Sequence, residues 1–254
     1  MPLLYAHRGA RLELPENTLP AFQRALELGA SALETDAHLT RDGHVILAHD
    51  ATAARMAGVP LAWAHATLAE ARSCDVGWGF RDEQGGRPYA GRGLRVPTLE
   101  ELLALLPGVP LSVDLKQHGT AMVAPVLALL RRLRAEEHVT LASFSSLTLL
   151  AARRRGYAGA TGLGREEAAL ALACPAALWR RLPWRGQVAQ LPTRLAALPL
   201  TSPRVVAHLR GLGLRVVYWT VNDPTEARAL LALGVDGLVS DDPALLAPLF
   251  TGAL

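Results

Sequence analysis

Short apolar runs alternate with stretches whose apolar residues recur at helical spacing. The runs typical of β-strands cover residues 3–6, 32–37, 111–115, 139–142, 160–163, 187–190, 215–219 and 237–240. The helical pattern is clearest at residues 18–28, 122–134, 203–212 and 226–233, and Gly29, Gly213 and Gly234 mark expected helix ends. Such alternation predicts parallel strands joined by crossover helices.

About eight strand–helix units in 254 residues are typical of an α/β protein with a (β/α)8 TIM barrel. We therefore predict a single domain over residues 1–254. A doubly wound open sheet is the alternative, but no Gly-x-Gly-x-x-Gly motif follows the first strand, which disfavours its dinucleotide-binding form. Residues 38–49 predict a hairpin with its turn at Asp42-Gly43. Residues 51–95 form a long irregular insertion after the second strand, which we expect to lie over the barrel mouth.

Composition excludes several classes of protein. Apolar residues make up 50% and charged residues 19%, which is unlike a disordered chain. No apolar run approaches the roughly 18 residues of a membrane-spanning helix, and the first residues do not resemble a secretory signal, so we expect a cytoplasmic protein without stable membrane insertion. The net charge of +3 and 5% aromatic residues disfavour nucleic-acid binding. No oligomeric state is predicted.

Polar residues interrupt the apolar strands near their ends, where the catalytic groups of a TIM barrel are found. Because alternate residues of a strand share a face, Glu34, Asp36 and Asp114 are expected to face one another at the barrel mouth. Three clustered carboxylates raise one another's pKa unless a cation lies among them. One hard divalent ion with oxygen ligands, Mg²⁺ or Ca²⁺, suits this position.

The neighbouring residues add cations and titrating groups. Arg8 and Lys116, the latter the only lysine of the chain, supply positive charge for an anion such as phosphate. His7 and His49 are suited to giving and taking protons near neutral pH. A metal ion, two cations and two histidines together favour hydrolysis of a phosphate ester.

Most of these residues lie in a series of motifs that covers nearly the whole chain. The motifs are His7-Arg8-Gly9, Pro15-Glu16-Asn17-Thr18, Glu34-Thr35-Asp36, His49-Asp50, Val96-Pro97-Thr98-Leu99-Glu100, Ser143-Phe144, Trp219-Thr220-Val221-Asn222, and Gly234-Val235-Asp236-Gly237 with Asp241 and Pro243. Their order and spacing resemble the glycerophosphodiester phosphodiesterase family.

The resemblance implies a role for each matching residue. Glu34, Asp36 and Asp114 would ligate one divalent metal ion, His7 and His49 would be the acid–base pair, Arg8 and Lys116 would hold the phosphate, and Trp219 would line the wall beside the glycerol. Glu16 and Asn17 are interpreted as supporting side chains. The family commonly has Glu where this chain has Asp114, so the third carboxylate is one methylene shorter.

The implied reaction is hydrolysis of a small glycerophosphodiester, such as glycerophosphocholine or glycerophosphoethanolamine, to sn-glycerol 3-phosphate and an alcohol. One alternative is a barrel that cleaves lysophospholipids or phosphoinositides, which an exposed apolar rim would indicate. Another is a non-catalytic barrel that binds phosphodiesters, which the two histidines disfavour. At single residues, Trp219 is also compatible with packing, Lys116 with a simple ion pair to Asp114, and Asn222 and Asp241 with helix capping.

Overall fold

The predicted barrel is present in the computed structural model, which describes residues 1–117, 119–179, 181–182, 185–196 and 198–250. The parallel strands of the described chain follow the order β6-β5-β4-β2-β1-β11-β10-β7, and a parallel bridge between Gly162 and Val188 joins the two ends of this series. The strands are β1 (Leu3–His7), β2 (Ala32–Leu39), β4 (Leu111–Leu115), β5 (Val139–Ala142), β6 (Ala160–Thr161), β7 (Val188–Pro192), β10 (Arg215–Trp219) and β11 (Gly237–Ser240).

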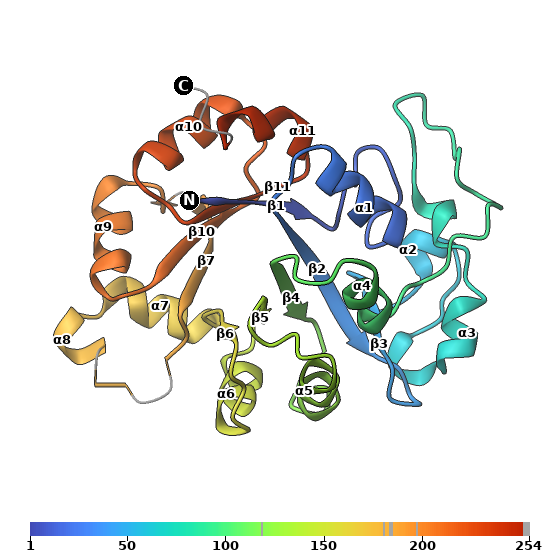
Figure 1. Cartoon of the computed structure of the whole chain (residues 1–254), viewed down its shortest axis with the longest axis horizontal. Helices are drawn as coiled ribbons and strands as arrows, with labels where there is room; N and C mark the ends of the chain where they lie inside the picture. Colours follow the sequence, from blue (N-terminus) through green and yellow to red (C-terminus); the bar gives the residue numbers. More distant parts are fainter. Residues whose placement is uncertain (118, 180, 183–184, 197, 251–254) are drawn as a thin grey trace.

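A helix follows each barrel strand, and together these helices surround the strands (Figure 1). They are α1 (Leu19–Glu27), α4 (Leu99–Leu105), α5 (Val123–Arg132), α6 (Ser146–Arg154), α7 (Arg165–Ala173), α9 (Pro203–Gly211), α10 (Pro224–Ala232) and α11 (Pro243–Leu246). Short additional helices are α2 (Ala54–Ala57), α3 (Leu68–Arg72) and α8 (Ala176–Trp179), with 3-10 turns at Trp63–His65, Val76–Gly79 and Ala247–Leu249. Of the described residues, no helix is both long and apolar enough to cross a membrane.

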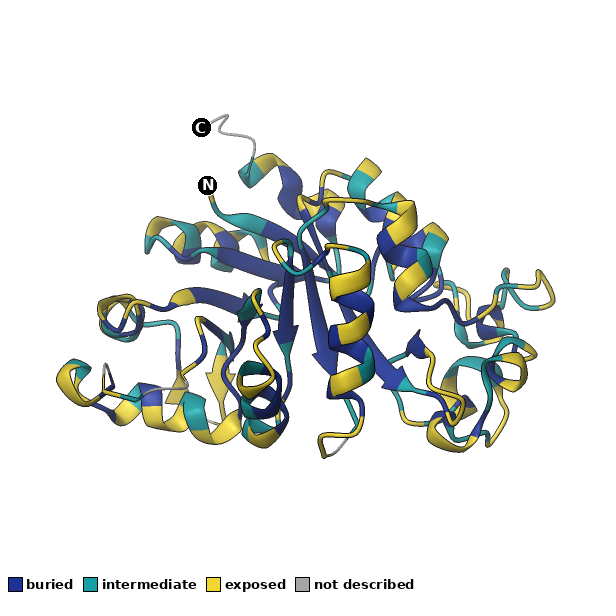
Figure 2. Cartoon of the chain, turned by 60° about the horizontal axis from the view of Figure 1, so that its bottom comes forward, coloured by how far each residue is buried: buried dark blue, intermediate teal, exposed yellow. Residues whose placement is uncertain are grey.

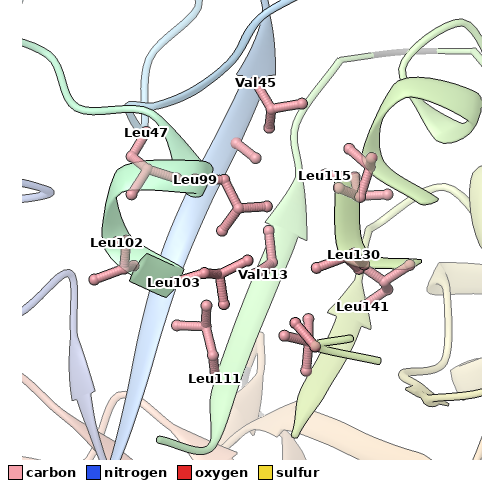
Figure 3. Close-up of a cluster of buried hydrophobic side chains, with 14 of the residues drawn as sticks. Val45, Leu47, Leu99, Leu102, Leu103, Leu111, Val113, Leu115, Leu130 and Leu141 are labelled. Atoms are coloured by element: carbon pink, nitrogen blue, oxygen red, sulfur yellow. The ribbon is translucent and has the colours of Figure 1, made fainter. Parts of the chain in front are cut away.

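Strand alternation separates the core from the site. On β4, the outward Leu111, Val113 and Leu115 join the apolar cluster between strands and helices (Figure 3), whereas Ser112 and Asp114 line a cavity inside the barrel. The strands are therefore buried on both faces, while the helices expose their outer side (Figure 2).

The predicted hairpin and insertion both follow β2. Strand β3 (Val45–Leu47) pairs antiparallel with β2, and residues 40–44 turn between them. Residues 51–95 pack beside β2 and β3 on the outside of the barrel (Figure 1), around a small core that contains the fully buried Trp63. None of these residues lines the cavity at the barrel mouth.

Two further elements were not predicted as strands. After β7 the chain forms a small antiparallel hairpin of β8 (Arg194–Leu195) and β9 (Leu198–Pro199). The predicted domain also includes residues 118, 180, 183–184, 197 and 251–254, which lie outside the described residues.

Candidate active site

A cavity of about 660 Å³ opens at the carboxyl ends of the barrel strands. All eight residues that the sequence singles out for the site lie on its wall: His7, Arg8, Glu34, Asp36, His49, Asp114, Lys116 and Trp219. They come from β1, β2, β4 and β10 and from the loops after β1, β3 and β4, so residues up to 212 positions apart in the sequence meet here.

The loop after β1 turns sharply because two of its residues have a positive φ. Arg8 has φ 60° and Gly9 has φ 82°. A Cβ atom at Gly9 would lie 2.7 Å from the carbonyl carbon of Ala21, so the loop can pass this close to α1 only with glycine. The close passage leaves His7 and Arg8 facing the cavity.

The three carboxylates differ in their electrostatic surroundings. Burial, reinforced by the charges of Asp36 and Asp114, raises the pKa of Glu34 well above its ordinary value. Burial also raises the pKa of Asp114, although Lys116 opposes the shift. Burial alone would raise the pKa of Asp36, but Lys116 and Arg8 outweigh it and lower the pKa. Negative charge is therefore in excess around Glu34.

Lys116 is the cation closest to this group. Its Nζ lies 2.8 Å from Oδ1 of Asp36 and 2.6 Å from Oδ2 of Asp114. Arg8 Nε lies 3.1 Å from Oδ2 of Asp36, to which Asn17 also donates a hydrogen bond of 3.0 Å. Two cations and one amide thus hold Asp36 in its ionised form.

The donor set suits a hard metal ion in part. Oε2 of Glu34 and Oδ1 of Asp114 are buried and have no hydrogen-bond partner, as expected of oxygens that could bind a cation. In the part of the chain that the structure describes, however, no three side chains of His, Cys, Asp or Glu stand ready as a metal-binding group. The ammonium of Lys116 between Asp36 and Asp114 is a cation that a divalent ion at these oxygens would have to compete with.

Each of the two candidate histidines contacts a carboxylate through Nδ1. His7 Nδ1 lies 2.7 Å from Oδ1 of Asp241, which follows β11. His49 Nδ1 lies 2.7 Å from Oδ1 of Asp50. Because an ionised carboxylate only accepts hydrogen bonds, both Nδ1 atoms donate, and Nε2 of each neutral ring is the free base.

The walls of the cavity differ in character. Trp219 contacts Phe144 edge to face with ring centroids 6.1 Å apart, and the guanidinium of Arg165 lies 5.8 Å from the Phe144 centroid. Beyond them the cavity continues into an apolar arm, defined here by Leu163, Ala168, Leu172, Leu191, Leu195 and Leu200. The cavity therefore has a charged half over β1, β2 and β4 and an apolar half beside α7 and β7.

Comparisons with known proteins identify the family. The model of the glycerophosphoryl diester phosphodiesterase family matches residues 7–245. The chain belongs to this family. The motif resemblance is thereby confirmed, and the chain is a phosphoric diester hydrolase, as predicted.

Individual phosphodiesterases agree over nearly the full length. A protein of Mycobacterium tuberculosis (strain ATCC 25618 / H37Rv) named "Probable glycerophosphodiester phosphodiesterase 2" is 34% identical, over 95% of this chain and 88% of the relative. A lysophospholipase D of Homo sapiens is 26% identical, over 95% of this chain and 83% of the relative. The crystal structure of a glycerophosphodiester phosphodiesterase from Agrobacterium tumefaciens shares the fold with a TM-score of 0.80, at 24% identity over 99% of this chain and 100% of that one.

Several polar residues of this phosphodiesterase site were not predicted to take part. Asp241 and Asn222 were open to interpretation as helix caps, but Asp242 and Asp223 cap α11 and α10, while Asn222 Nδ2 donates to Asp241 Oδ2 at 3.0 Å. Because Asn222 is followed by Asp223 and Asp241 by Asp242, the sequence alone does not show which residue of each pair caps the helix.

Arginine residues of the site were also missed. Arg11 contacts Asp241, and Arg55, in the insertion, contacts Asp50. A chain with 26 Lys and Arg residues gives no signal that separates these two from the surface. The motif Pro15-Glu16-Asn17-Thr18, in contrast, did draw attention to Glu16 and Asn17. Both side chains are buried beside the polar side of the site.

Proposed function

We propose that this phosphodiesterase hydrolyses glycerophosphodiesters, such as glycerophosphocholine or glycerophosphoethanolamine, to sn-glycerol 3-phosphate and an alcohol by general acid–base catalysis. The observation that carries the proposal is the pair His7 and His49: both line one cavity, and each has its Nδ1 held by a carboxylate. Two oriented imidazoles that share this cavity with Arg8 and Lys116 suit a reaction with one proton removed and one delivered.

In this scheme one histidine removes the proton of the attacking hydroxyl, which belongs to water or to C2 of the glycerol. Attack by water gives sn-glycerol 3-phosphate directly, whereas attack by the C2 hydroxyl gives a cyclic phosphate, which a water molecule then opens to the same product. The other donates a proton to the oxygen of the departing alcohol, so that no free alkoxide forms. Arg8 and Lys116 hold the phosphate oxygens through charge-assisted hydrogen bonds, and Trp219 packs against the glycerol.

We further propose that Glu34, Asp36 and Asp114 hold one Mg²⁺ or Ca²⁺ ion. The support is the pair of buried oxygens without partners on Glu34 and Asp114. When bound, such an ion neutralises phosphoryl charge and lowers the pKa of a coordinated hydroxyl group. Asp114 is one methylene shorter than the Glu that the family commonly has at this position. Asp114→Glu is therefore expected to preserve the dependence on the metal.

A coupled assay for glycerol 3-phosphate with glycerophosphocholine tests the proposal. His7→Ala and His49→Ala are each expected to lower kcat by about 10²-fold or more while circular dichroism stays unchanged. Exhaustive dialysis against EDTA is expected to abolish activity, and Mg²⁺ or Ca²⁺ to restore it. Wild-type turnover in either histidine variant would refute the acid–base assignment, and full activity after chelation would refute the metal.

A second substrate class, lysophospholipids, is favoured by the apolar arm. Phe144 and Leu195 line the cavity and are 53% and 59% exposed, which gives its mouth the apolar rim expected for contact with lipid. The apolar walls of the arm, which includes Leu195, match an acyl chain rather than a choline or ethanolamine group.

Filling the arm distinguishes the two classes. Ala168→Phe is expected to lower kcat/KM for lysophosphatidylcholine roughly 10-fold or more and to leave that for glycerophosphocholine unchanged. Ala173→Phe is the matched control, since Ala173 is exposed on the same helix and does not line the cavity. An equal loss of kcat/KM for both substrates, or no loss for either, would show that the apolar arm does not bind the substrate.

A further inference from the structure

Both candidate catalytic histidines belong to one continuous chain of hydrogen bonds and ion pairs. From His49 the chain passes to Asp50 at 2.7 Å and from Asp50 to Arg55 at 2.6 Å. Arg55 then contacts Glu16 at 2.6 Å. The chain therefore joins the end of β3, the insertion and the loop after β1.

The same glutamate leads on to the other histidine. Arg11 NH2 lies 3.4 Å from Glu16 Oε2, and Arg11 NH1 lies 3.1 Å from Asp241 Oδ1. Asp241 then reaches His7 at 2.7 Å. Arg11 NH1 also comes within 3.4 Å of His7 Nδ1, but the shorter contact to Asp241 decides the position of the proton.

Glu16 is well suited to anchor this chain. Its side chain is only 6% exposed, and its two oxygens accept a forked pair of hydrogen bonds from Arg55 at 2.6 and 3.1 Å. Arg8 donates a further bond of 3.2 Å. Burial by itself would raise the pKa of Glu16, but Arg55, Arg8 and Arg11 lower it, so the anchor is ionised.

The carboxylates at the two ends fix the hydrogen of each imidazole. Arg55 binds Oδ2 of Asp50 and leaves Oδ1 for His49. Asn222 binds Oδ2 of Asp241 and leaves Oδ1 to Arg11 and His7. With one oxygen of each carboxylate fixed, each ring has its Nδ1–H bound and its Nε2 directed away from the carboxylate.

We propose that Glu16 is a positioning residue that sets the orientation and tautomer of both His7 and His49 through Arg11–Asp241 and Arg55–Asp50. It contacts no reacting atom and acts only through these pairs. The proposal rests on the acid–base roles given above. It also gives the insertion a role in catalysis, because Arg55 completes one of the two links from Glu16 to the histidines.

The test is Glu16→Gln, which keeps the shape and removes the charge. We expect kcat for glycerophosphocholine to fall roughly 10-fold or more, since general acid–base transfer is worth about 10²–10⁴-fold and depends on ring orientation. KM is expected to change less than kcat. Glu167→Gln is the matched control: Glu167 makes a similar forked ion pair with Arg153 and does not line the cavity, so its kcat should match the wild type.

Nitrogen-15 spectra of labelled histidine provide a readout independent of activity. In alkaline buffer the wild type should show the Nδ1–H tautomer at both rings, assigned with His7→Gln and His49→Gln. In Glu16→Gln both rings should shift toward a mixture of tautomers. Unchanged spectra with reduced kcat would indicate a structural effect and overturn the proposal.

Two further variants test separately the two links from Glu16 to the histidines. Arg55→Lys, which cannot contact Asp50 and Glu16 as a fork, should alter only the spectrum of His49, and Arg11→Lys only that of His7. Wild-type kcat and spectra in Glu16→Gln, alongside inactive His7→Ala and His49→Ala, would refute the anchor and leave the proposed function intact. Active histidine variants would refute the proposed function itself.

Discussion

The carboxylate of Glu34, which we propose as a metal ligand, lies in surroundings that oppose folding. It is mostly buried, one of its oxygens has no partner, and the charges of Asp36 and Asp114 lie beside it. Its Oε2 lies 3.9 Å from Nε2 of His7, whereas Lys116 contacts the other two carboxylates rather than Glu34. A group in such surroundings is retained for function and not for stability.

We therefore predict that Glu34→Gln stabilises the metal-free protein. Removal of one buried negative charge is expected to raise the free energy of unfolding by about 1 kcal/mol and to abolish hydrolysis. Urea unfolding in EDTA at neutral pH measures the first effect. Asp75→Asn, remote from the cavity, is a comparison for loss of a carboxylate elsewhere, and a less stable Glu34→Gln protein would contradict the prediction.

The eight predicted residues, which all line the cavity, could be singled out from the sequence because they stand out locally. Glu34 and Asp36 interrupt an apolar strand, and His7 comes directly after one. Arg55 gives no comparable signal, and Asp241 stands out only through the motif resemblance, since their contacts span 39 and 234 residues of sequence. Such contacts follow from closure of the barrel and not from any local pattern.

At the scale of elements, the loops after the barrel strands carry the site and the helices hold those loops. The sequence predicted the strands through their apolar runs, but it singled out only four of the helices that follow them. Helix α4 shows why: Thr98 and Glu101 form a capping box for it, yet the motif around Thr98 was noted only for its resemblance. Part of the family's motif is thus a helix start.

The contact between the loop after β11 and His7 makes stability depend on pH. Burial alone would raise the pKa of Asp241, but hydrogen bonds from His7 and Asn222 and the charge of Arg11 lower it well below its usual value. A carboxylate with a lowered pKa stabilises the fold above the unfolded value, near 3.9, and loses this contribution as the pH falls below it.

Asp241→Asn is accordingly expected to reduce the free energy of unfolding by roughly 1.5–3 kcal/mol at pH 7. The difference from the wild type should shrink as the pH falls below about 4. Urea unfolding at pH 7, 5 and 3 measures both. A difference that grows on acidification would have the wrong sign for a depressed carboxylate pKa.

At the scale of the whole molecule, the barrel concentrates opposed charges in one place. The predicted barrel was confirmed. It could be predicted because eight successive strand–helix units are compatible with few arrangements of parallel strands. The flank position of residues 51–95 was not predictable, since their attachment depends on Trp63 Nε1 donating to the carbonyl of Asp50 and on Arg55 reaching Glu16.

If the carboxylates hold a divalent ion, the entire fold should gain stability from it. Titration with Mg²⁺ or Ca²⁺ is expected to raise Tm, with about 2.7 kcal/mol of stabilisation at a concentration 100 times Kd. Glu34→Gln should remove most of this gain. Identical Tm shifts in both proteins would show that the ion binds elsewhere.

The pairing of neighbouring barrel strands differs in length around the barrel. Between β6 and β7 the described chain has an isolated bridge of Gly162 with Val188. Between β6 and β7 the backbone contacts are two hydrogen bonds, Gln187 N to Thr161 O at 2.9 Å and Leu163 N to Val188 O at 3.1 Å, whereas β2 and β4 pair over five positions. Leu163 also borders the apolar arm. We therefore expect local opening of the barrel to begin between β6 and β7, with the amide hydrogens there exchanging before those of β2 and β4. Such opening would widen the cavity at its apolar half while the strands that carry the charged residues keep their register.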